Sequence, residues 1–187
     1  MDQLQEVKAK ISLIDERIRV SSVTCDTTSD TSVASLAHKV RQEFGRLDVL
    51  VHNAGFSGPL TLLMASGSPT DFKTAFDVNC TGVYLAAHYF IPLLLASPQG
   101  AKAFIAVSSM AAHMTNGPVA NHGYCVSKMA QMRLVEFMAE QYGGKGLFAV
   151  AVHPGGVKTG FAKGIPEGFE KCTWFSSLFS FLEREYG

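Results

Sequence analysis

The sequence has no excess of charge of either sign, because 16 lysine and arginine residues stand against 16 acidic residues. It has no basic patch and no interleaving of aromatic with basic residues, which are the usual marks of a nucleic-acid-binding surface. Its cysteines show no C-x-x-C pair and no cysteine–histidine cluster at zinc-ligand spacing. They are Cys25, Cys80, Cys125 and Cys172. We therefore expect no nucleic-acid partner, no metal site, and reduced thiols in a reducing compartment.

Signals for export and for membrane insertion are also lacking. The first residues, Met1-Asp-Gln-Leu-Gln-Glu6, are polar and contain no apolar signal core. The long uncharged stretch around Val83 to Ala96 includes Pro92 and is shorter than the roughly 20 apolar residues of a spanning helix. We expect this stretch to be a buried helix, with no membrane partner, in a soluble cytoplasmic protein.

The length and the apolar content of the chain are those of one globular domain. Its 187 residues, 47% of them apolar, are enough for one substantial core and too few for two ordinary domains. We therefore expect a single domain over residues 1–187. Three short runs are almost wholly apolar, as strands of a parallel sheet covered by helices are. These runs are Asp48–His52, Ala103–Val107 and Leu147–Val152.

Helical segments alternate with the apolar runs. Gln3–Glu16, Thr70–Ser97 (with a break) and Tyr124–Tyr142 have helical composition. A further helix is expected to start at Asp30 or Thr31 and to end at Gly45, because apolar residues between them recur every three or four positions. We also expect a strand over Arg17–Thr24, ending at Cys25–Asp26. This alternation predicts an α/β fold with a doubly wound parallel sheet.

Polar residues that could take part in a reaction follow the apolar runs, at the position where ligands bind in open α/β sheets. Ser108 and Ser109 come directly after the second run, and Tyr124 and Lys128 lie four residues apart at the start of a helix. Such a pair shares one helix face, at roughly 5–6 Å between Cβ atoms. A nearby ammonium favours phenolate and lowers a tyrosine pKa, which makes the tyrosine usable as a general acid or base. The spacing alone is a weak signal, since a half-buried tyrosine beside a solvated lysine has the same pattern.

The context of this pair strengthens the interpretation. Five segments occur in order, and together they resemble the short-chain dehydrogenase/reductase family over about residues 18–159. They are His52-Asn-Ala-Gly55, Asn79-Cys-Thr-Gly82, Val107-Ser-Ser-Met-Ala-Ala112, Tyr124-Cys-Val-Ser-Lys128 and Pro154-Gly-Gly-Val-Lys-Thr159. The resemblance implies a Rossmann-like fold and an NAD(P)-dependent oxidoreductase that interconverts a carbonyl and a secondary alcohol.

The resemblance also implies roles for four catalytic residues. Tyr124 matches the acid/base that protonates or deprotonates the substrate oxygen, and Lys128 matches the lysine that holds the nicotinamide ribose and lowers the tyrosine pKa. Ser109 matches the residue that positions the carbonyl, with Ser108 as the lesser alternative because the gap to Tyr124 is slightly long. Asn79 matches the helix asparagine of a proton relay, a role compatible with a scaffold function.

Cofactor contacts implied by the resemblance lie at both ends of the matched region. Tyr124 and Lys128 belong to this set too, and Val157 and Thr159 resemble contacts to the nicotinamide amide and phosphates. Asn53 lies in the family's Asn-Asn-Ala-Gly motif, which here begins with histidine. Asp26 resembles an aspartate that contacts adenine, although a simple turn or cap residue is an equal alternative.

One expected family segment does not occur. No Gly-x-x-x-Gly-x-Gly turn, which would bring backbone N–H groups to a pyrophosphate, is present anywhere in the sequence. We therefore expect a form truncated at the N-terminus, lacking the first two strands of the family. The residue that selects NAD or NADP is absent with them, so NADP is favoured over NAD on family grounds only.

Two functions remain open from the sequence. The first is an oxidoreductase acting on a small-molecule carbonyl or alcohol. The second is a truncated, non-catalytic homologue that serves as a partner-binding or structural subunit. In either case a homo-oligomer formed through the long helices is expected.

Overall fold

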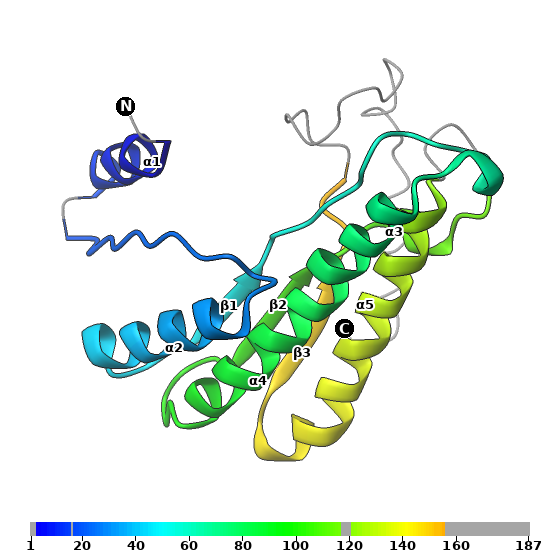
Figure 1. The fold of residues 1–187 in the computed structure, drawn as a ribbon. Helices are drawn as coiled ribbons and strands as arrows, with labels where there is room; N and C mark the ends of the chain where they lie inside the picture. The colour runs from blue at the N-terminus through cyan, green and yellow to red at the C-terminus, as the bar shows by residue number, and fades with distance from the viewer. Residues whose placement is uncertain (1–2, 16, 117–120, 156–187) are drawn as a thin grey trace.

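The computed structural model describes residues 3–15, 17–116 and 121–155. Figure 1 shows a parallel sheet with helices packed against it, while the first helix lies apart from the sheet. The helices are α1 (Gln3–Ser12), α2 (Asp30–Phe44), α3 (Pro69–Phe76), α4 (Gly82–Leu95) and α5 (His122–Tyr142). Shorter helical turns are η1 (Met64–Ser66), η2 (Asp77–Thr81), η3 (Met110–His113) and η4 (Gly143–Lys145).

The three apolar runs form the sheet. The strands β1 (Val49–His52), β2 (Ala103–Val107) and β3 (Phe148–Val152) pair in the order β1-β2-β3, and both pairings are parallel. His52 lies opposite Ala106, and Val107 lies opposite Val152, so the carboxyl ends of the strands meet at one edge. Each prediction of an apolar strand is confirmed.

The predicted helices are found with small shifts at their ends. The helix that starts the chain ends at Ser12. Ser29, and not Asp30 or Thr31, caps α2, because its side chain accepts a hydrogen bond from the backbone N–H of Ser32. Gly45 ends α2 in the left-handed conformation at φ 71°, as predicted. The expected break between residues 70 and 97 is the π-helical turn η2, which joins α3 to α4.

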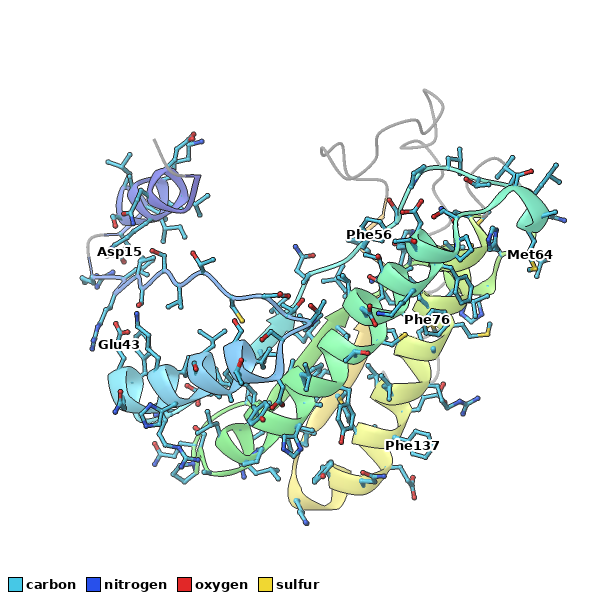
Figure 2. All side chains as sticks on the ribbon, viewed as in Figure 1. Asp15, Glu43, Phe56, Met64, Phe76 and Phe137 are labelled. Atoms are coloured by element: carbon cyan, nitrogen blue, oxygen red, sulfur yellow. The ribbon has the colours of Figure 1, made fainter. Side chains whose placement is uncertain are left out.

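The strand predicted over Arg17–Thr24 does not form. The segment is extended but has no strand beside it within the described residues, and a ladder of backbone hydrogen bonds needs a partner. Side chains hold it to α2 instead. Arg19 and Ser21 both bond to the carboxylate of Glu43, at 3.3 and 3.0 Å, and Figure 2 shows Glu43 on α2 beneath this segment.

The core lies between the sheet and three adjacent helices, α2, α4 and α5. Phe104 and Ala106 of β2 are fully buried against them. Alternation along the strands turns Val51 and Phe148 to the opposite face, where they are 57% and 60% exposed. A parallel sheet covered by helices confirms the predicted α/β class. Among the described residues, these covering helices lie on one face.

The continuous helical segment Pro69–Leu95 is long and apolar enough to cross a membrane by composition alone. More than half of its most apolar window is buried within the protein. Val83 and Leu94 have no exposed surface, because α4 packs against β1, β2 and the flanking helices. The apolar side chains of this helix are thus buried in the core, as expected from the sequence.

Candidate active site

Tyr124 and Ser109 come together at the carboxyl edge of the sheet. Ser109 follows β2 and caps η3, where its Oγ accepts a hydrogen bond from the N–H of Ala111 at 3.1 Å. Its hydroxyl is therefore available to donate, and a hydrogen bond from Ser109 to Tyr124 lowers the pKa of that tyrosine. Ser108 is buried, and its Oγ has no hydrogen-bond partner among the described residues. The geometry therefore favours Ser109 over Ser108.

Lys128 lies one turn after Tyr124 on α5 and is only 3% exposed. Its ammonium donates hydrogen bonds to the carbonyl oxygen of Val107, at 2.8 Å, and to Oε1 of Gln131, at 3.0 Å. Burial lowers the pKa of Lys128 to about 8. The Nζ atom lies 5.8 Å from the centre of the Tyr124 ring, so the two side chains share one helix face as the spacing predicted.

The pKa of Tyr124 does not move in the predicted direction. Burial raises it, and the hydrogen bond from Ser109 only partly offsets this. The expected lowering by Lys128 requires the ammonium close to the phenol oxygen. Here the ammonium is held at Val107 and Gln131 instead. The chain without a ligand thus keeps Tyr124 as the protonated phenol at neutral pH.

Asn79 is fully buried in the π-helical turn and joins two parts of the site. Its amide accepts a hydrogen bond from the N–H of Phe56 and donates one to the carbonyl of Phe56, both at 2.9 Å. It also donates to Oγ of Ser127 on α5, at 2.8 Å. Figure 2 shows Phe56 on the segment between β1 and α3. Asn79 therefore has the scaffold function, and π-helical turns are frequent at functional sites.

The remaining predicted residues lie around this centre or outside the described chain. Asn53 follows β1 and is exposed. Asp26 is exposed, and its carboxylate accepts hydrogen bonds from the N–H and hydroxyl of Thr28 at 2.9 and 2.8 Å. These contacts match the turn alternative for Asp26. Val157 and Thr159 lie outside the described residues.

Three buried or capping side chains were not singled out from the sequence. Asn121 caps α5 and donates to the carbonyls of Ser57 and Pro59, both at 2.8 Å. Ser127 and Gln131 are fully buried and bond to Asn79 and Lys128. The signal for Gln131 was its position three residues after Lys128, and for Ser127 its position three after Tyr124.

A small hollow opens beside Tyr124. It lies between the segment after β1, the start of α3 and the start of α5, and its lining includes Ser57, Phe72, His122 and Gly123. The ring of Phe72 lies 6.3 Å from that of His122 in a stacked arrangement. Within the described residues, no group of three or more histidine, cysteine, aspartate or glutamate side chains could hold a metal ion. The reactive groups at this edge are thus hydroxyls, an ammonium and amides.

Comparison with known proteins identifies the family. The profile described as enoyl-(acyl carrier protein) reductase matches residues 1–183. The chain belongs to the short-chain dehydrogenase/reductase family. The short chain dehydrogenase mpl6 of Monascus purpureus is 38% identical over 149 residues, which are 80% of this chain and 49% of that protein. A short chain aldehyde dehydrogenase of Euphorbia lathyris is 33% identical over 140 residues, or 75% of this chain and 47% of that one.

Solved short-chain dehydrogenase/reductase structures share the fold. One from Mycobacterium marinum superposes with a TM-score of 0.78 at 27% identity, covering 87% of this chain and 62% of that one. A 7α-hydroxysteroid dehydrogenase solved with NADH and 7-oxo glycochenodeoxycholic acid gives 0.71 at 27% identity, covering 82% and 57%. ElxO with NADP bound gives 0.71 at 29% identity, covering 83% and 61%. The fold is thus Rossmann-like, and this family member spans about half the length of the curated relatives it matches.

The residues of this family member fit one end of a nicotinamide dinucleotide. At the carboxyl edge they offer the buried ammonium of Lys128 and the hydroxyls of Ser109 and Tyr124. These are donors suited to a ribose hydroxyl and a substrate oxygen. The sequence contains no glycine-rich turn for the pyrophosphate. The donors at this edge would therefore suit the nicotinamide ribose better than the pyrophosphate.

Proposed function

We propose that this chain carries the proton-transfer centre of an NAD(P)-dependent oxidoreductase that interconverts a carbonyl and a secondary alcohol of a small molecule. The observation that carries the proposal is the hydrogen bond between Ser109 and Tyr124, one helical turn from the buried ammonium of Lys128. The folded chain brings these groups together from two elements, and proton transfer to a carbonyl oxygen needs such groups. Family membership supports the same chemistry.

Each residue then has a specific task. Tyr124, held protonated by burial, donates its proton to the carbonyl oxygen in reduction and accepts it back in oxidation. Ser109 donates a hydrogen bond that keeps the reacting oxygen beside the phenol. Lys128 would hold a ribose hydroxyl through its buried ammonium. When bound, NADPH or NADH would supply the hydride in reduction, and NADP or NAD would take it up in oxidation. The solved relatives contain NADP in one case and NADH in another, so NADP remains only the family-based preference.

Replacing Tyr124 by phenylalanine tests this assignment. We expect Tyr124→Phe to lower the turnover of a ketone or aldehyde panel at least about a hundredfold, because it removes the transferable proton. Consumption of NADPH or NADH, followed by absorbance, measures this. Tyr142→Phe, the same change at the other end of α5, is the control and should retain activity. A Tyr124→Phe variant with near wild-type turnover would remove Tyr124 from this role.

One observation favours the second function, a non-catalytic homologue that binds a partner or has a structural role. The chain has no glycine-rich turn in its sequence, and backbone N–H groups of such a turn supply much of the grip on a dinucleotide. We therefore expect NADPH to bind this chain only weakly in a fluorescence titration. A submicromolar dissociation constant would contradict this expectation and would favour the oxidoreductase.

We also propose that the chain forms a homo-oligomer through its long helices. Tyr84 on α4 is 56% exposed, and Val126, Met129 and Phe137 on α5 are 49%, 50% and 54% exposed. Figure 2 shows Phe137 on the side of α5 that faces away from the sheet. Large exposed apolar side chains on α4 and α5 are suited to contact with a second copy.

A further inference from the structure

Gln131 has an unusual position for an amide side chain. It lies three residues after Lys128 on α5, and none of its surface is exposed. Its Oε1 atom accepts a hydrogen bond from the ammonium of Lys128 at 3.0 Å. Its Nε2 atom has no hydrogen-bond partner among the described residues. The interaction with Lys128 is therefore what orients the amide, because an amide NH₂ group cannot accept from an ammonium.

A buried amide with an unsatisfied N–H group is costly to a fold. Burying a polar group without a partner destabilises the folded state, and an apolar side chain of the same shape would avoid that cost. Gln131 lies next to an apolar core that includes Val135 and Met138 on the same helix. Packing alone thus favours a methionine or leucine at this position. The benefit of the amide lies in its contact with Lys128.

Lys128 has little other compensation for its buried charge. Among the described residues, the titratable groups that influence it are His52 of β1, Cys80 of η2 and, at the ring face, Tyr124 of α5. None of these is a carboxylate, and His52 is neutral at physiological pH because burial and the charge of Lys128 lower its pKa to about 4. The carbonyl of Val107 and the amide of Gln131 are the acceptors that the structure gives to the ammonium.

We infer that Gln131 is a positioning residue for Lys128. Its amide oxygen and the Val107 carbonyl take two of the three N–H groups of the ammonium and so set the direction of the third. Within the described residues no acceptor is given for the third N–H group, which is the one left for a ligand oxygen. The assignment of that oxygen to a ribose rests on the proposed function, whereas the hold of Gln131 on Lys128 does not.

The titration of Lys128 tests this inference without a cofactor. The chain is labelled with ¹³C,¹⁵N-lysine, and the side-chain signals are followed by NMR as the pH is raised. The signal lost in Lys128→Arg identifies the residue. In Gln131→Met the charged form loses an acceptor, so the midpoint should fall by about one pH unit. In Gln131→Glu a carboxylate faces the ammonium, so the midpoint should rise by about one pH unit or more.

Opposite shifts from the two variants distinguish positioning from a structural effect, since loosened packing would move both midpoints toward that of an exposed lysine. Gln141→Met, an exposed position on the same helix, is the matched control and should leave the midpoint unchanged. Unchanged midpoints in both Gln131 variants would overturn the inference. If Gln131→Met fails to fold, a Gln131→Glu midpoint at or below that of the wild type would also overturn the inference. Loss of activity in Tyr124→Phe, or its absence, bears on the proposed function alone.

Discussion

His52 is an ionisable residue that the fold keeps neutral. It is 6% exposed at the end of β1, facing the helices. Burial first, and the charge of Lys128 second, lower its pKa from an ordinary 6.5 to about 4. The unfolded chain therefore takes up a proton on His52 before the folded chain does. It follows that keeping His52 neutral lowers the free energy of unfolding as the pH falls through this interval. Above pH 6.5 this loss of stability is absent.

We predict that the free energy of unfolding decreases between pH 6.5 and about 4, and that His52→Asn flattens this decrease by up to about 3 kcal/mol. Urea unfolding at a series of pH values measures the effect. His38, exposed on α2, provides the control variant His38→Asn, which should keep the wild-type pH dependence. Burial also lowers the pKa of His153, so a residual slope in His52→Asn is expected. An undiminished slope in His52→Asn would contradict the prediction.

The elements of the site are joined by a few buried hydrogen bonds. Asn79 in η2 links the segment after β1 to α5, and Asn121 links the start of α5 to the same segment. Both are amides, which can donate and accept at once and so can connect two backbone segments. These hydrogen bonds attach the beginning of α5, which carries Tyr124, to the segment that follows β1.

We predict that Asn79→Ala lowers the free energy of unfolding by about 3 kcal/mol, because it leaves the N–H and carbonyl of Phe56 and the hydroxyl of Ser127 without a buried partner. Chemical denaturation followed by circular dichroism measures this loss. Asn116→Ala, at an exposed position, should change stability by less than about 0.5 kcal/mol. Equal effects of the two substitutions would show that the hydrogen bonds of Asn79 contribute nothing to the free energy of unfolding.

At the scale of the whole molecule, the described residues leave apolar side chains exposed on the sheet and on α5. Val51 and Phe148 are exposed on the sheet face opposite the helices, and Phe137 is exposed on the outer side of α5. Both surfaces are suited to association, but only the second belongs to the long helices through which we propose a homo-oligomer.

We predict that Phe137→Asp reduces the molar mass measured by light scattering after size exclusion, because a buried charge at a helix–helix contact is unfavourable. Met64→Asp is the control. Met64 is 75% exposed in η1, and Figure 2 shows it well separated from Phe137. An unchanged mass for Phe137→Asp would exclude this surface, and a decrease in both variants would indicate non-specific association.

The sequence by itself determined the class of fold and the residues that we propose as reactive. Strand and helix periods follow from local alternation of apolar and polar residues, so β2 was predicted to its end residues and α5 to within two. Five segments in order, with the Tyr124–Lys128 motif among them, carried the family assignment. A strand over residues 17–24 was predicted wrongly, because strand formation depends on a neighbouring strand, which local sequence does not specify.

Only the tertiary structure decided how the reactive residues are arranged and charged. The hydrogen bond from Ser109, the capture of Lys128 by Gln131 and the raised pKa of Tyr124 all depend on side chains that packing brings together from separate elements. A pKa reflects burial and neighbouring charges in three dimensions, and the spacing of Tyr124 and Lys128 predicted the wrong direction because it took no account of burial. Residue types thus define the available chemistry, whereas packing determines the protonation state and the hydrogen-bond partners of each residue.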